Sequence, residues 1–146
     1  MAVWFQDVVD ALQMLSQDDR YYYDSYLDEL VYLSVEDFRF DSRDGLEEEI
    51  EEGVMGRFVR LPTYYDFNPY TFMERYVYHL PDGDLSDRLS RAIRGRSAFR
   101  RFKSELERCD RLEDWYAFEA QCYKELVLDW CQENEIAIVD NRLKKI

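Results

Sequence analysis

The stretch WYAFEAQCYKELVLDW, residues 115–130, decides the fold of this 146-residue chain. Read with a period of 3.6 residues, its apolar side chains form two stripes that cover most of the circumference of a helix. One stripe comprises Trp115, Phe118, Cys122 and Leu126, and the other comprises Tyr116, Ala120, Tyr123, Val127 and Trp130. A helix that is apolar over so wide an arc is usually central in its bundle. We therefore predict a core helix that begins near Leu112 and ends at Asn134.

Three shorter amphipathic helices are predicted before this core helix. Asn68 is a good N-cap and Pro69 a good first residue for a helix that Pro81-Asp82-Gly83 stops. A second helix ends near Gly95, and Ser97 is predicted to cap a third. Their predicted buried faces are Tyr70, Met73, Tyr76, Val77 and Leu80; then Leu85, Leu89, Ala92 and Ile93; then Phe99, Phe102, Leu106 and Cys109.

The N-terminal part combines one helix with strands. Apolar residues at helical spacing, from Phe5 to Leu15, predict an amphipathic helix over residues 3–15. Two runs rich in Tyr, Val and Leu, residues 21–23 and 30–33, favour strands, and the turn chemistry between them predicts an antiparallel hairpin. The residues of that turn signal are Asp24, Ser25 and Asp28.

Further short elements complete the prediction. Ser34 is expected to cap a short helix over residues 35–40, and the acidic run 41–52 is expected to be a solvated helix face or a linker. Extended segments are expected at residues 58–61 and 136–139. The fold class is thus α+β and mainly helical, with a small N-terminal antiparallel hairpin and a cluster of four to five helices. We predict one domain, with an acidic part at 1–60, a helical core part at 61–140 and a basic tail at 141–146.

Composition excludes several classes of protein. Hydrophobic residues make up 47% of the chain and aromatic residues 16%, which is enough apolar surface to build a core and excludes a disordered chain. No apolar run approaches the roughly 18 residues that a membrane span needs. Acids stand near the N-terminus where a signal peptide carries bases. We therefore expect a cytoplasmic protein that does not engage a membrane.

The residues of common catalytic and metal sites are sparse. Cys109, Cys122 and Cys131 show no C-x-x-C spacing and are predicted to be free thiols, and the single histidine, His79, is predicted to be exposed. No Gly-rich phosphate loop, G-x-S-x-G or H-E-x-x-H motif occurs. We assign no catalytic residue, no metal ligand and no cofactor, and an enzyme is the disfavoured class of function.

Charge is divided unevenly along the chain. The formal net charge is −13, and residues 1–66 hold 17 acids against 5 bases. The segment 88–111 holds 9 bases against 3 acids, a net charge of +6 within a strongly acidic protein. Opposite charges on one chain can neutralise each other, or each can attract a partner of opposite charge.

A family resemblance is carried by the string Ala92-Ile93-Arg94-Gly95-Arg96-Ser97-Ala98-Phe99-Arg100-Arg101-Phe102-Lys103. Together with residues 113–118, 73–76 following Leu61-Pro62, and 31–34, it resembles a bacterial family catalogued as uncharacterised protein family 0158. Members of that family often carry glycine where this chain has Ser97, and often a glycine in the hairpin turn. The resemblance implies a bacterial, intracellular protein of unknown function, and it brings no activity, ligand or catalytic residue.

The junction before and within the third helix is the candidate binding site. Its predicted partner- or anion-binding residues are Arg94, Arg96, Arg100 and Lys103. A helix N-terminus carries free N–H groups, and guanidinium groups beside it can hold an anion.

Three hypotheses follow from this charge pattern. The leading one is a non-enzymatic protein-interaction or regulatory module that uses the segregated acidic and basic surfaces. The alternatives are binding of phosphate or nucleic acid through the basic segment 88–111, and an acidic protein that mimics DNA. Nucleic acid is less favoured, because most of the chain would repel a polyanion. The oligomeric state is not predicted.

Overall fold

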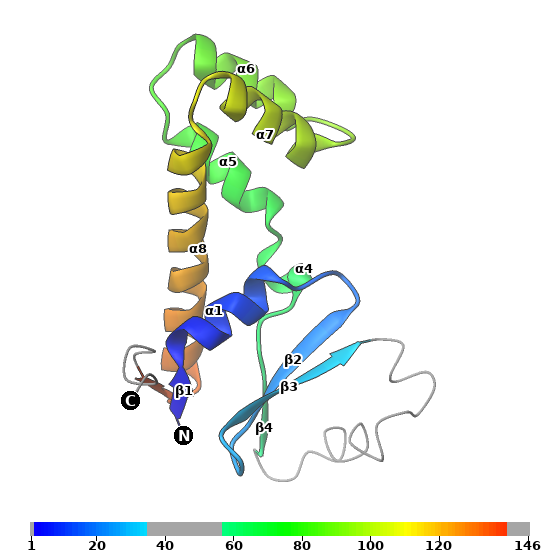
Figure 1. Ribbon diagram of the computed structural model, residues 1–146, viewed down its shortest axis with the longest axis vertical. Coiled ribbons are helices and arrows are strands. Elements are labelled where there is room, and N and C mark those ends of the chain that lie inside the picture. Colours follow the sequence, from blue (N-terminus) through cyan, green and yellow to red (C-terminus); the bar gives the residue numbers. More distant parts are fainter. Residues whose placement is uncertain (1, 35–56, 140–146) are drawn as a thin grey trace. The chain divides into compact units, whose positions relative to one another are not determined.

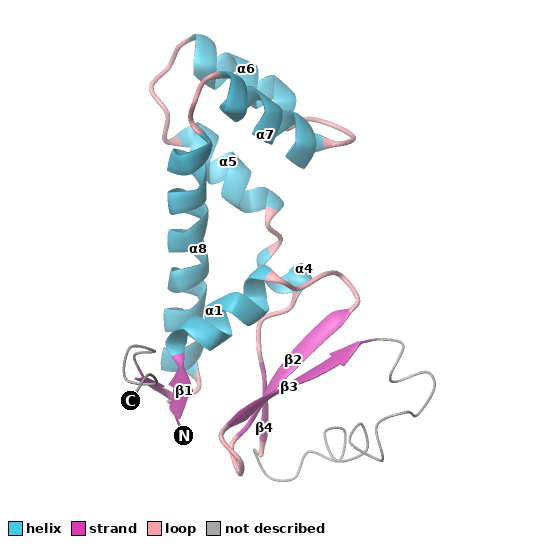
Figure 2. Cartoon of the chain, in the orientation of Figure 1, coloured by secondary structure: helices cyan, strands magenta, loops and turns pink. Residues whose placement is uncertain are grey.

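The computed structural model describes residues 2–34 and 57–139 (Figure 1). This part of the chain divides into two compact units. The first unit contains the described residues of Met1–Asp66 and Tyr123–Ile146, and the second contains Phe67–Cys122. The prediction of one domain is not tested by this division and stays a prediction. The mainly helical α+β class is confirmed: helices dominate and the strands are short (Figure 2).

A three-stranded antiparallel sheet forms the larger β part of the first unit. The strands β2 (Asp19–Asp24) and β3 (Glu29–Ser34) are the predicted hairpin, and β4 (Phe58–Arg60) pairs with the free edge of β2. Tyr22 therefore stands opposite Val31 on one side and Arg60 on the other. The predicted extended segment at 58–61 is confirmed as β4. Asp28, in the hairpin turn, has a φ of 53°.

The two ends of the described chain form a second, parallel pair of strands. Here β1 (Ala2–Trp4) pairs with β5 (Ala137–Val139), with Val3 opposite Ile138. The predicted helix over residues 3–15 is therefore shorter: α1 spans Phe5–Gln13. The expected extended segment at 136–139 is confirmed as β5. Pairing with a strand at the other end of the chain leaves no local signal, and this explains why β1 was not predicted.

Tyr23 and Trp130 lie in the core of the first unit. Tyr23 is completely buried, and its ring meets the ring of Trp130 edge-to-face at 6.5 Å between centroids. The indole Nε1 of Trp130 donates a hydrogen bond to the backbone carbonyl of Arg60 over 2.9 Å. The hydroxyl of Tyr23 contacts the carboxylate of Asp28 and the backbone of Ala2. The buried hydroxyl of Tyr23 and the buried indole N–H of Trp130 thus both have hydrogen-bond partners, as buried polar groups in folded proteins usually do. Their contacts connect β2, the hairpin turn and α8 (Leu112–Glu133).

The second unit is helical. It contains α5 (Tyr70–Tyr78), α6 (Asp84–Ala92), α7 (Ala98–Arg108) and the first half of α8 (Leu112–Glu133); the short helix α4 (Tyr64–Phe67) lies at its boundary in the sequence. The predicted helices and the predicted end of α8 are confirmed. The start of α5 lies one residue later than predicted, with Pro69 in place of Asn68 at the N-cap position. The backbone N–H of Tyr70 donates to Oδ1 of Asn68 over 3.2 Å.

An aromatic cluster holds these helices together. Phe102 is completely buried, and its ring lies 4.9 Å from that of Trp115 at an angle of 85°. Tyr76 meets the ring of Phe102 edge-to-face at 5.9 Å. Edge-to-face pairs of this kind add to the stabilisation that burial alone gives. The predicted packing of Phe102 against the helix that contains Trp115 is confirmed.

Three side-chain predictions are wrong. Phe99 is 37% exposed, because the buried face of α7 follows the four-residue spacing Ala98, Phe102 and Leu106. Tyr116 is also exposed, with Nζ of Lys103 6.0 Å from the centre of its ring. Ser97 has a left-handed backbone and makes no side-chain cap to α7.

Three other predictions fall outside the described residues. They are the short helix at 35–40 with its expected cap at Ser34, the acidic run at 41–52 and the basic tail at 141–146.

Candidate functional site

A pocket of about 550 Å³ lies between α6 and α7, which run side by side in the second unit (Figure 1). Both helices supply cationic side chains to it. Its lining comprises Arg88, Arg91, Ala92, Arg100, Arg101, Ser104, Glu105 and Arg108. Five guanidinium groups and one carboxylate therefore surround one concavity. A volume of this size falls within the range of small-molecule sites in proteins.

Helical spacing explains why these residues share one surface. Arg88 and Arg91 are three residues apart on α6, and Arg100, Ser104 and Arg108 follow each other at four-residue intervals on α7. Residues three or four apart lie on the same face of a helix. The turn between the helices then brings the two arginine faces together.

Arg101 fixes that turn. Its Nε donates to the backbone carbonyl of Ala92, the last residue of α6, over 3.1 Å, and its Nη atoms contact the carbonyls of Arg94 and Arg96. The last carbonyls of a helix have no partner within the helix, so a guanidinium at this point both satisfies them and complements the helix dipole. Arg101 is therefore a structural residue of the pocket wall.

Two further arginines are held by local partners. Nε of Arg88 lies 3.2 Å from the carboxylate of Asp84, and its Nη2 lies 3.1 Å from the sulfur of Cys109. Arg108 forms an ion pair with Oε1 of Glu105 at 3.4 Å. These contacts orient two guanidinium groups along the pocket while leaving most of their N–H donors available.

Arg91 and Arg100 differ from the other three arginines. Both are exposed, and neither side chain makes a hydrogen bond or ion pair with another residue of the described part of the chain. They come from opposite walls of the pocket. A guanidinium offers five N–H donors in a planar fork that matches the oxygens of phosphate and carboxylate. This pair of arginines is the part of the pocket best suited to grip an anion.

One buried polar atom of the pocket lacks a partner. Within the described residues, Oε2 of Glu105 is buried without a hydrogen bond, whereas the buried Nε of Arg88 faces the carboxylate of Asp84 at 3.2 Å. Most buried polar atoms in folded proteins are hydrogen-bonded. A bound hydrogen-bond donor would supply the contact that Oε2 lacks.

The sequence-based candidate residues are divided by the structure. Arg100 lines the pocket, whereas Arg94 lines a different depression together with Tyr70, Tyr78 and others. Arg96 is exposed in the turn before α7, and Lys103 lies over the ring of Tyr116. The structure thus does not bring the four predicted residues into one site.

Sequence reasoning missed Arg88, Arg91, Arg101 and Arg108. The signal was present in the basic segment 88–111, in which all four residues lie. Selecting them requires knowing that α6 and α7 fold back on each other, so that the inner faces of the two helices meet. Of the residues singled out from the sequence, Arg94 and Arg96 lie in the turn before α7, and Arg100 and Lys103 lie on α7.

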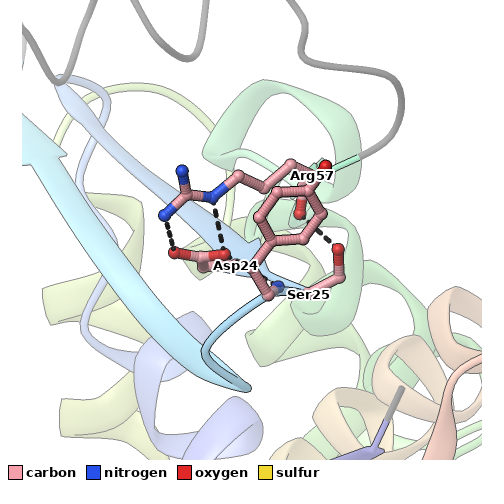
Figure 3. Close-up of polar contacts among 4 residues, drawn as sticks. Asp24, Ser25 and Arg57 are labelled. Atoms are coloured by element: carbon pink, nitrogen blue, oxygen red, sulfur yellow. Dashed lines mark hydrogen bonds and ion pairs between the residues drawn. The ribbon is translucent and has the colours of Figure 1, made fainter.

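In the first unit, Arg57 is an arginine whose guanidinium group is already hydrogen-bonded to a carboxylate, that of Asp24 (Figure 3). Arg57 donates from Nε and Nη2 to the two carboxylate oxygens of Asp24, over 3.0 and 2.9 Å. Ser25 returns two hydrogen bonds to the carbonyl of Arg57, each of 2.8 Å. The hydrogen bonds from Arg57 keep the pKa of Asp24 below its usual value, although burial opposes the effect. This cluster closes the hairpin turn and presents no free fork to a ligand.

A third pocket, of about 380 Å³, lies beside the single histidine. It is lined by Tyr76, His79, Leu80, Asp114, Ala117 and Phe118. His79 is exposed, as predicted, and its Nδ1 lies 2.7 Å from the carbonyl of Arg75. The hydroxyl of Tyr76 donates to Asp114 over 2.7 Å, and burial together with this bond raises the pKa of Tyr76 to about 12. The carboxylate and the phenol of this pocket are thus already bound to each other.

The three cysteines are free thiols, as predicted. Cys122 and Cys131 are buried, and burial raises the pKa of Cys131 to about 11. Among residues 2–34 and 57–139, no group of three His, Cys, Asp or Glu side chains is placed to hold a metal ion. Across the same residues, no helix combines the length and the apolar character that a membrane span requires.

The comparisons with known proteins find one family. The model described as Uncharacterised protein family (UPF0158) matches residues 1–144, which confirms the resemblance found in the sequence. No curated protein and no solved structure matches the chain.

Proposed function

We propose that this chain, which belongs to the uncharacterised protein family UPF0158, binds a phosphate-bearing ligand in the pocket between α6 and α7. The observation that carries the proposal is the pair Arg91 and Arg100. Two exposed guanidinium groups from facing helices, without partners among the described residues, point to an anion that both can hold.

The acidity of the whole chain does not oppose this role. At physiological ionic strength, charges more than about 8 Å apart in solvent are largely screened from each other. A small ligand therefore responds mainly to the five arginines and one glutamate of the lining. A long polyanion such as nucleic acid would also meet the acidic remainder of a chain whose net charge is −13, and is the less favoured occupant.

A protein partner is the second candidate, in keeping with the leading hypothesis from the sequence. It is favoured by the exposure of Arg91 and Arg100, since carboxylates on a partner could reach the same two guanidinium groups. A partner bound in this way would be displaced by phosphate. The two candidates therefore share a site and differ in what the pocket holds in the cell.

Calorimetric titration of the full chain with inorganic phosphate tests the proposal. We expect saturable binding that the double change Arg91→Ala, Arg100→Ala abolishes. The matched control is Arg94→Ala, Arg96→Ala, which removes the same charge from exposed positions outside the pocket lining. If both double variants lose phosphate binding equally, the loss follows from net charge and not from the pocket, which contradicts the proposal. Absence of phosphate binding to the wild-type chain would also overturn the proposal.

A further inference from the structure

Glu105 differs in charge from the arginines that line the pocket between α6 and α7. It is the single acid among the lining residues, and its side chain is 21% exposed. Oε1 holds one ion pair, to Arg108 at 3.4 Å, while Oε2 is buried and has no hydrogen-bond partner among the described residues. An ionised carboxylate accepts about four hydrogen bonds, so most of this capacity is unused.

The carboxylate of Glu105 can meet a ligand in the pocket, because this residue belongs to the lining and its side chain is not fully buried. Glu105 lies one helical turn from Arg101 and three residues from Arg108, and it lines the same pocket as Arg91 and Arg100. A negatively charged acceptor therefore faces any anion that the arginines attract.

Such an acceptor discriminates between anions by their protons. An anion with no hydrogen presents only oxygen lone pairs to the carboxylate and is repelled. An anion that carries an O–H or N–H donor can point it at Glu105 and turn the repulsion into a charge-assisted hydrogen bond. Sulfate carries no proton at neutral pH, whereas inorganic phosphate always keeps at least one.

We propose that Glu105 is a specificity-determining residue that makes the pocket select anions carrying a hydrogen-bond donor, phosphate in preference to sulfate. This inference rests on the proposed function and names the ligand chemistry of the same site. The arginines supply attraction to any tetrahedral dianion. The carboxylate then penalises those that cannot donate a hydrogen bond.

The test compares phosphate with sulfate at pH 7, by calorimetric titration of the wild-type chain and of Glu105→Gln. For the wild type we expect phosphate to bind at least about tenfold more tightly than sulfate, the effect of one hydrogen bond to a charged group. In Glu105→Gln the amide replaces the charge and adds a donor, so sulfate binding strengthens and the preference falls to about threefold or less. The matched control is Glu107→Gln, an exposed residue of the same helix that does not line the pocket, and it should keep the wild-type preference.

The possible results distinguish failure of the Glu105 role from failure of the anion site itself. A wild-type chain that binds both anions equally would overturn the role of Glu105 and leave the anion site standing. An unchanged preference in Glu105→Gln would do the same. If neither anion binds, the proposed function fails, and the specificity fails with it. The wild-type comparison needs no variant, so the inference remains open to refutation even if Glu105→Gln does not fold.

Discussion

Arg101 on α7 donates a hydrogen bond of 3.1 Å to the backbone carbonyl of Ala92, the residue at which α6 ends. The same guanidinium contacts the carbonyls of Arg94 and Arg96 in the turn. One side chain therefore closes the α6–α7 hairpin and sets the distance between the two arginine-lined walls. The geometry of the candidate site depends on this contact.

Replacing Arg101 with Leu should destabilise the fold. The change leaves three carbonyls without the cation that they share, and a hydrogen bond to a charged group contributes about 1.5–3 kcal/mol. We expect a loss of that order in the free energy of unfolding, measured by urea denaturation. Arg100→Leu is the matched control and should change stability by about 0.5 kcal/mol or less, because Arg100 is exposed. Equal effects of the two variants would refute the structural role of Arg101.

Ser97→Gly should stabilise the protein. Ser97 has a φ of 60°, a left-handed backbone that costs a residue with a Cβ about 1–2 kcal/mol. Glycine removes that cost but is more flexible in the unfolded chain, so we expect a net gain below about 1 kcal/mol. Thermal unfolding of the two proteins side by side measures it. A lower midpoint for Ser97→Gly would show that the serine side chain contributes more than its backbone strain costs.

Phe102→Ala should come close to unfolding the chain. Removal of a large buried aromatic side chain costs about 3–5 kcal/mol, and small domains hold only about 5–15 kcal/mol in total. Phe99→Ala, three residues away and 37% exposed, is the comparison and should cost much less. Chemical denaturation gives both values. A Phe102→Ala protein as stable as wild type would contradict the packing of the aromatic cluster.

Asp24→Asn should weaken the fold in a pH-dependent way. Hydrogen bonds from Arg57 hold the pKa of Asp24 below its usual value, so the ionised pair stabilises the folded state above the unfolded pKa of about 3.9. That contribution is lost as the pH falls through the lower folded-state pKa. We expect the free energy of unfolding of the wild-type protein to exceed that of Asp24→Asn by about 1.5–3 kcal/mol at neutral pH.

The check is the unfolding free energy of both proteins from neutral pH down to about pH 2. The difference in unfolding free energy between wild type and Asp24→Asn should stay constant above about pH 5 and shrink below about pH 4. A difference that persists unchanged into the acid range would mean that the charge of Asp24 contributes nothing and that the substitution acts through packing.

Most of the fold was predictable from local sequence patterns. The hairpin was predictable because the residues of each strand favour extended structure and the turn residues lie between them, and α5 to α8 were predictable from their apolar spacing. Phe102 lies in the middle of such a stripe and was placed correctly. In contrast, the pairing of β1 with β5 joins the two ends of the described chain, and no neighbouring residue indicates it.

The candidate site was predictable only as a region. Clustering of bases identified the segment that contains the pocket, but the residues that face each other depend on how the turn at Gly95–Ser97 redirects the chain. Two left-handed residues there, Gly95 and Ser97, set that direction. Arg101 was overlooked for a related reason: its partners are backbone carbonyls, and these have no signature in a sequence.

The most direct test of the anion site is a phosphate titration followed by NMR through the Nε–Hε signals of the arginine side chains. The signals of Arg91 and Arg100 should shift together and saturate at one common affinity, while those of Arg94 and Arg96 remain unchanged. Shifts of equal size at all four arginines, or no saturable shift at Arg91 and Arg100, would contradict a phosphate site between α6 and α7.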